Sequence, residues 1–126
     1  MREVLLIAVA GALGTVSRYL VSNLAVRMWG GSFPHGTLAV NVVGCLLIGF
    51  LMHVGLHTDL FSPTSRLVFT VGFLGAFTTF STFSYEATGY ITRGAWGMAV
   101  LVISIHIILG VSAVLAGAAL GRVTSG

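Results

Sequence analysis

Five hydroxyl side chains stand within seven residues of the third apolar stretch, where leucine or isoleucine would be expected. They belong to Thr78, Thr79, Ser81, Thr82 and Ser84. One or two hydroxyls in a membrane helix can bond back to their own backbone, but five exceed that role. With Gly72 and Gly75 just before them, they predict a local break in the helix. Such breaks are tolerated at membrane depth only inside protein or along an aqueous cavity, and they often form ion sites.

Two aromatic residues lie among these hydroxyls. Phe80 and Phe83 are three residues apart and therefore share a helix face. Ordinary packing is the commoner role of aromatics at this spacing. The functional alternative is that their ring edges, which carry positive quadrupole charge, face an anion. The other polar groups fall on two further faces: Thr79, Thr82 and Glu86 on one, Ser81 and Ser84 on the other. A charged Glu86 would cost about 2.5–3.5 kcal/mol at the bilayer centre, so we expect it to face protein or water.

The composition indicates which elements position these groups. The chain has 126 residues, of which 56% are hydrophobic and 7% charged, whereas soluble domains carry about 25% charged residues. A membrane span needs about 20 apolar residues, so four spans would use most of the chain. We therefore predict an all-α integral membrane protein with one membrane domain over residues 1–126. The predicted helices cover about 4–28, 37–56, 65–92 and 95–121, with the third broken at the midplane.

The six arginines are divided evenly between the two sides of the predicted bundle. Three lie on the side of the N-terminus and three on, or toward, the other side: Arg2, Arg66 and Arg122 against Arg18, Arg27 and Arg93. The positive-inside rule then gives no preference. Either a weaker feature such as Asp59 or loop length sets one orientation, or the protein has dual topology and pairs antiparallel. The scattered cations also argue against nucleic-acid binding.

The glycine content bears on where an ion could pass. The chain holds 17 glycines, many of them in the predicted spans, and small residues let membrane helices pack closely. Four helices packed in this way leave no internal channel, so a transport path would need a second subunit. Cys45 is the only cysteine, which excludes an intrachain disulfide.

Three segments carry a resemblance to a known family. They are Gly11-x-x-Gly14-x-x-x-Arg18, Gly36-Thr37-Leu38-Ala39-Val40-Asn41-x-x-Gly44, and Gly72-Phe73-Leu74-Gly75 followed by Thr78 to Ser84 and Glu86. On these motifs the chain resembles the Fluc (CrcB) fluoride channels of bacteria, over nearly its whole length. The resemblance implies a passive fluoride channel of the inner membrane that protects against fluoride toxicity. It also implies an antiparallel, dual-topology homodimer with two pores, each lined by both subunits.

The same resemblance implies roles for individual residues. The expected fluoride pore consists of Asn41, Phe80, Phe83, Ser81, Thr82, Glu86 and His106. The backbone carbonyls of Gly75 and Thr78 would hold a structural Na⁺ at the dimer centre. Arg18 would lie at a vestibule and attract anions, although a snorkelling arginine is an equal alternative. Some relatives carry a polar track of Tyr and Ser in the fourth helix, where this chain has Val102, His106 and Gly110. His106 could equally be a buried neutral histidine bonded to a neighbouring helix.

Two other function classes compete with a fluoride channel. Small multidrug or guanidinium exporters are also four-helix, dual-topology proteins, but they need a membrane carboxylate in the first helix, and this chain has only Glu3 at its start. A haem protein would need two histidines at matched depth on facing helices. The four histidines are His35, His53, His57 and His106. One cysteine and no acid pair argue against an enzyme.

Overall fold

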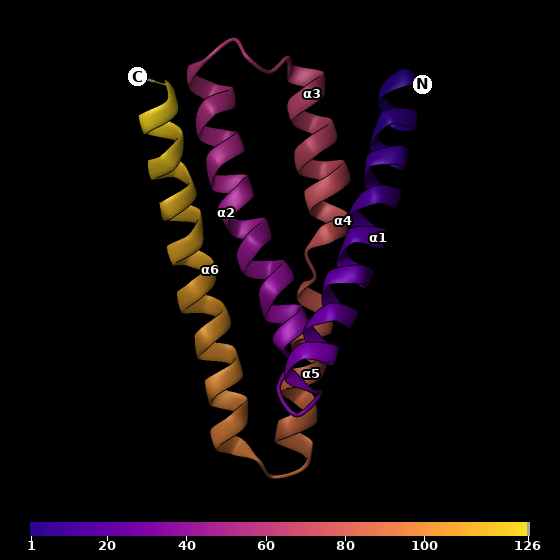
Figure 1. The fold of residues 1–126 in the computed structure, drawn as a ribbon, viewed down its shortest axis with the longest axis vertical. Helices are drawn as coiled ribbons and strands as arrows, with labels where there is room; N and C mark the ends of the chain where they lie inside the picture. Colours follow the sequence, from indigo (N-terminus) through magenta and orange to yellow (C-terminus); the bar gives the residue numbers. More distant parts are fainter. Residues whose placement is uncertain (126) are drawn as a thin grey trace.

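Four long apolar helices run the length of the molecule and are joined by short loops (Figure 1). A computed structural model describes residues 1–125. The elements are α1 (Arg2–Trp29), α2 (His35–His57), α3 (Pro63–Leu67), the π-helix η1 (Val68–Leu74), α4 (Gly75–Phe77), α5 (Phe80–Thr92) and α6 (Trp96–Ser125). Both termini and the α2–α3 loop lie at one end, and the other two loops lie at the opposite end. The prediction of four membrane-spanning helices with a broken third is confirmed.

The helix ends differ from the predicted ones by two residues or fewer, except that α6 continues to Ser125 rather than ending at 121. Arg122 lies in its last turn, where a cation is favourable beside the helix carbonyls. Arg18 stays within α1, as predicted. That helix ends at Trp29, and its C-cap Gly30 has a positive φ of 79°, which glycine adopts without steric cost.

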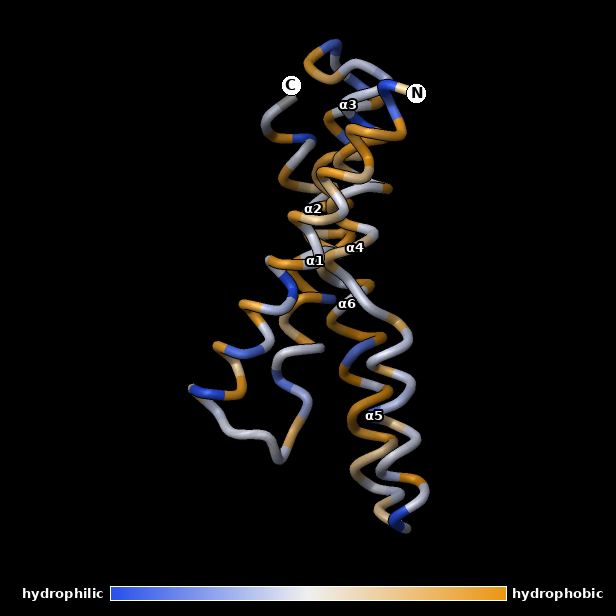
Figure 2. The backbone as a smooth tube through the Cα atoms, turned by 90° about the vertical axis from the view of Figure 1, so that its right-hand side faces the viewer, coloured by the Kyte–Doolittle hydropathy of each residue, from blue (hydrophilic) through white to orange (hydrophobic). Residues whose placement is uncertain are grey.

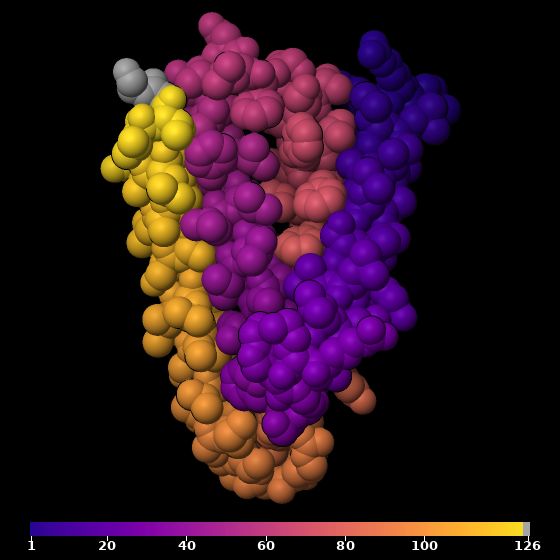
Figure 3. All heavy atoms as spheres, in the orientation of Figure 1, coloured from indigo at the N-terminus to yellow at the C-terminus, as the bar shows by residue number. Residues whose placement is uncertain are grey.

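Two helix pairs pack backbone to backbone through glycine. In the α2–α6 pair, a Cβ at Gly49 would overlap the backbone carbonyl of Val114. In the pair of α1 with the third helix, a Cβ at Gly14 would overlap the carbonyl of Phe73. Small residues are how membrane helices approach this closely. By contrast, α2 and the upper half of the third helix do not close completely against each other (Figure 3).

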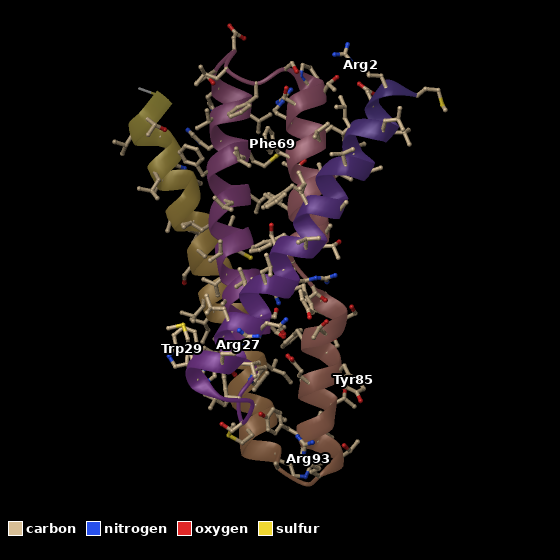
Figure 4. All side chains as sticks on the ribbon, turned by 45° about the vertical axis from the view of Figure 1, so that its right-hand side comes forward. Arg2, Arg27, Trp29, Phe69, Tyr85 and Arg93 are labelled. Carbon is tan, nitrogen blue, oxygen red and sulfur yellow. The ribbon has the colours of Figure 1, made fainter. Side chains whose placement is uncertain are left out.

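Apolar side chains are exposed along all four spans, and most charged side chains lie toward the ends, with Arg18 inside α1 and Glu86 inside α5 as the exceptions. Leu5 and Leu115 are 65% and 66% exposed, whereas Val40 and Val102 are fully buried between helices. Hydrophobic residues accordingly occupy most of the backbone tube (Figure 2). Arg2 lies at one end of the bundle, and Arg93 lies at the other (Figure 4). Such a surface suits lipid or a second subunit rather than water.

Candidate functional site

The third membrane helix is interrupted at Thr78 and Thr79, near its middle. Both residues are extended, with φ and ψ of −86° and 162° at Thr78 and −152° and 114° at Thr79. Thr78 caps the C-terminal end of α4, because its N–H and its Oγ1 both donate to Leu74 O at 3.0 Å. Thr79 caps the N-terminal end of α5, because its Oγ1 accepts from the N–H of Thr82 at 3.2 Å. The hydroxyl cluster thus caps both helix ends at the break, which confirms the predicted position.

Asn41 of α2 binds the extended backbone at the break. Its Nδ2 donates to Thr79 O at 3.0 Å, and its Oδ1 accepts from Thr79 N–H at 2.8 Å. Thr79 is only 8% exposed, so without this pair two polar backbone groups would lie unpaired in an apolar setting. Gly44, one turn along α2, leaves the space that Thr78 occupies at the break, because a Cβ there would overlap Thr78 Cγ2. The resemblance gave Asn41 a contact with fluoride, and the structure adds this positioning role.

Two carbonyl groups lose their helical partners at the break. In a continuous helix, the N–H of Thr79 would bond Gly75 O and the N–H of Thr82 would bond Thr78 O. Here Thr79 N–H donates to Asn41 Oδ1, and Thr82 N–H donates to Thr79 Oγ1. The oxygens of Gly75 and Thr78 are therefore released from the helix pattern, and both residues line the same cavity.

That cavity, of about 390 Å³, lies between α2, the broken helix and α6. It brings together six of the predicted site residues: Asn41, Gly75, Thr78, Phe80, Phe83 and His106. The rings of Phe80 and Phe83 lie with centroids 5.5 Å apart and planes tilted by 56°. Phe80 is 78% exposed, whereas Phe83 is half-buried. The predicted shared face is therefore confirmed, and one side of it is left uncovered by this chain.

His106 closes the α6 side of the cavity. Its ring centroid lies 4.5 Å from that of Phe83. Its Nδ1 lies 2.8 Å from Val102 O and must carry the hydrogen, because a carbonyl only accepts. Nε2 is buried and has no partner among the described residues. In the neutral ring this nitrogen holds a lone pair, so only the imidazolium form can donate from it to an anion. The alternative in which His106 bonds a neighbouring helix is wrong, since the Val102 carbonyl belongs to the same helix.

Glu86 lies outside this cavity and is held by α2. Its Oε1 accepts from Thr37 Oγ1 at 2.8 Å, and its Oε2 is buried without a partner among the described residues. Thr37 precedes Asn41 by one helical turn, so one face of α2 binds the broken helix twice. Glu86 lines a second cavity of about 240 Å³ beside Tyr90 and Arg93. Sequence reasoning gave Thr37 no role, although its spacing from Asn41 carried the signal.

The remaining predicted residues lie apart from the main cavity. Ser81 and Thr82 are exposed at the start of α5, and their hydroxyl oxygens lie 3.3 and 3.0 Å from Thr79 Oγ1. Thr79 does lie beside Thr82, but it does so as the N-cap of α5 and not on a shared helical face, because Thr79 is extended and precedes the helix. Arg18 is half-buried in α1 and lines neither of the two cavities.

Comparison with known proteins assigns this arrangement to a family. The profile described as "CrcB-like protein, Camphor Resistance (CrcB)" matches residues 5–118. The chain belongs to the CrcB-like family. Three relatives are each named "Fluoride-specific ion channel FluC". The one from Dehalococcoides mccartyi is 49% identical over 96% of this chain and 93% of its own. The relative from Maridesulfovibrio salexigens is 45% identical over 97% of this chain and 97% of its own. The relative from Agrobacterium fabrum is 44% identical over 97% of this chain and 98% of its own.

Membership of the CrcB-like family, with four apolar spans, makes this chain a multi-pass membrane protein. The exporter alternative has no support in α1, where Glu3 lies at the helix start and accepts from Thr64 Oγ1 at 2.7 Å. The haem alternative has no support in α2, because the rings of His53 and His57 stack with their centroids 4.2 Å apart. That spacing leaves no room for a macrocycle between them.

Proposed function

We propose that this CrcB-like protein is a fluoride-selective channel, not an enzyme, and that it lets fluoride leave the cytoplasm passively. The observation that carries the proposal is the broken third helix. Asn41 holds the backbone at the break by hydrogen bonding, and its amide lines one cavity together with the rings of Phe80 and Phe83. The names of the relatives support fluoride as the ion. Their bacterial sources support the inner membrane as the location, where passive efflux would protect the cell against fluoride toxicity.

The cavity suits a small, strongly hydrated anion. Asn41 Nδ2 has two hydrogens, and Thr79 O takes one, which leaves one for the ion. The edges of Phe80 and Phe83 offer weak positive charge, and α5 begins at Phe80 with the positive end of its dipole. Among the residues that the structure describes, no arginine lines the cavity. Weak donors without a fixed cation replace lost water without trapping the ion, which conduction requires.

A second copy of the chain would complete the pore. Phe80 is 78% exposed on this chain, and Ser81 and Thr82 are exposed beside it. An antiparallel homodimer would cover these groups and form two equivalent pores. The even distribution of arginines between the two ends of the bundle supports insertion in both orientations. Lipid would then cover the outer apolar surface.

The released carbonyls support a structural Na⁺ at the centre of that dimer. Gly75 O and Thr78 O have lost their helical N–H partners, as described above. Two such oxygens from each subunit would give four ligands, and backbone carbonyls can replace the hydration shell of an alkali cation. When bound, this ion would supply positive charge and hold the two breaks together.

Flux from liposomes tests the proposal. Purified protein is reconstituted into vesicles loaded with potassium fluoride, and release is followed with a fluoride electrode. We expect fluoride release to require valinomycin, because a passive channel carries charge and potassium must follow as the counter-ion. We expect the release to be independent of a pH gradient. Release driven only by a proton gradient would instead support an exporter.

Orientation is tested separately. Both termini are mapped in the wild type and in a variant with one lysine added to a single loop. We expect both orientations in the wild type and one in the variant. A wild type found wholly in one orientation would overturn the antiparallel dimer.

A further inference from the structure

Two histidines lie side by side at the C-terminal end of α2, beyond Ile48, which is the last α2 residue that lines the cavity. His53 and His57 are four residues apart, so both project from one face of the last turns. Their ring centroids are 4.2 Å apart and their planes differ by 17°. Histidines at this helical spacing are those that hold a zinc ion in metalloprotease helices. The pair belongs to none of the ion contacts proposed above.

A hydrogen bond fixes which nitrogen of His57 is available. Its Nδ1 lies 2.8 Å from the backbone oxygen of His53. A carbonyl oxygen only accepts, so Nδ1 carries the hydrogen and Nε2 of the neutral ring keeps its lone pair. Metal-ligating histidines commonly donate their other ring N–H to a backbone carbonyl in this way, which orients the ring and raises the basicity of the ligand. His57 is therefore already in the tautomer that a metal ion requires.

The neighbouring helix restrains the other ring. A Cβ built on Gly121 of α6 would lie 3.0 to 3.3 Å from Cβ, Cδ2 and Cγ of His53, so this side chain packs directly on the glycine backbone. His57 lies on the outer side of the pair and is exposed to solvent. His53 is thus restrained by packing, whereas His57 is restrained by its hydrogen bond alone.

The surroundings limit the site to two protein ligands. No group of three or more histidine, cysteine or acidic side chains lies together in the part of the chain that the structure describes. The next residue of α6, Arg122, is a cation that opposes metal binding. Water would complete the coordination shell. Imidazole nitrogens suit copper, nickel and zinc, and the affinity for divalent ions is highest for Cu²⁺.

We propose that His53 and His57 form a binding site for a divalent transition-metal ion at the end of α2, with Cu²⁺ bound more tightly than Ni²⁺ or Zn²⁺. Each metal–nitrogen bond is about 2.0–2.1 Å long. Because the lone pair of an imidazole lies in the ring plane, the two rings, whose planes differ by 17°, must turn out of their stack for both Nε2 atoms to face one ion. Binding would clamp the last turn of α2 beside the loop to α3. The site is independent of fluoride conduction.

Calorimetric titration of the untagged, metal-free protein in detergent with CuCl₂ tests this proposal. We expect one ion per chain, and an electron paramagnetic resonance spectrum of the bound Cu²⁺ with two coordinated nitrogens. His57→Ala removes an exposed ring and should leave the fold intact, but it should weaken binding by about tenfold or more and remove one nitrogen signal. His53→Ala should do the same.

His35→Ala serves as the matched control. This ring lies at the other end of α2, between Trp29 and Phe33, with centroid distances of 5.7 and 4.9 Å. We expect its removal to leave the copper isotherm unchanged. Unaltered binding in His57→Ala, an equal loss in His35→Ala, or the absence of saturable copper binding in the wild type would each overturn the proposal.

Discussion

Replacing Asn41 by leucine should destabilise the protein through the break in the third helix rather than through lost packing. Leucine is close in size to asparagine, and it removes both hydrogen bonds to Thr79, of 3.0 and 2.8 Å. The N–H and the carbonyl of Thr79 then lose their partner at a residue that is only 8% exposed. The variant therefore separates the effect of the two lost hydrogen bonds from the effect of side-chain volume.

The expected loss follows from two unpaired groups. An unsatisfied buried polar group costs about 1–3 kcal/mol, so two would cost roughly 2–6 kcal/mol at a dry site. Hydrogen bonds between membrane helices average about 0.6 kcal/mol in mutant cycles, because the unfolded chain also finds partners. The cavity beside Asn41 has room for water, which would partly replace the lost bonds. We expect a loss of about 2 kcal/mol in the free energy of unfolding.

Reversible denaturation in mixed micelles measures this quantity, and fluoride efflux is followed on the same preparation. Asn23→Leu, an identical change on the exposed surface of α1, is the control and should stay within about 0.5 kcal/mol of wild type. Asn41→Asp keeps the acceptor for Thr79 N–H but places a carboxylate against the Thr79 carbonyl, and it should reduce the flux sharply. If Asn41→Leu unfolds like Asn23→Leu, the hydrogen-bond pair does not hold the break.

Three further substitutions test other contacts. Gly44→Ala places a methyl group on Thr78 Cγ2 and should cost about 1–3 kcal/mol of unfolding free energy by overpacking; Gly97→Ala, whose Cβ meets nothing within 4 Å, should not destabilise the protein. Thr37→Val removes the hydrogen bond to Glu86 and should cost about 1.5–3 kcal/mol, whereas Thr37→Ser should retain most of it; equal losses in both would contradict the role of the hydroxyl. Phe80→Ile should lower fluoride efflux roughly tenfold, equivalent to about 1.4 kcal/mol in the barrier, and Phe69→Ile, outside the cavity, should leave it unchanged.

The sequence predicted the spans and the break because each has a local cause. Continuous apolar length specifies a membrane helix, and glycines followed by Thr78 and Thr79 specify where its hydrogen bonds can be interrupted. The π-helix from Val68 to Leu74 carried no such signal. A π-helix depends on how one helix packs against its neighbours, which the sequence pattern of that helix does not record.

The partners of individual side chains were harder to predict than the elements. The helical-face argument applied to Phe80 and Phe83, which lie within α5, and failed for Thr79, which is extended. The amide of Asn41 has two possible uses, and only the three-dimensional placement of α2 beside the break shows that it binds backbone. The bond between Thr37 and Glu86 spans 49 residues and depends on the same placement.

The selectivity of the conducted ion tests the central claim most directly. Purified protein is inserted into a planar lipid bilayer with fluoride on one side and an equal concentration of chloride on the other, and the reversal potential is measured. A fluoride channel built from weak donors and ring edges predicts a reversal potential set by fluoride alone. A reversal potential near zero, with chloride carrying an equal share of the current, would contradict it.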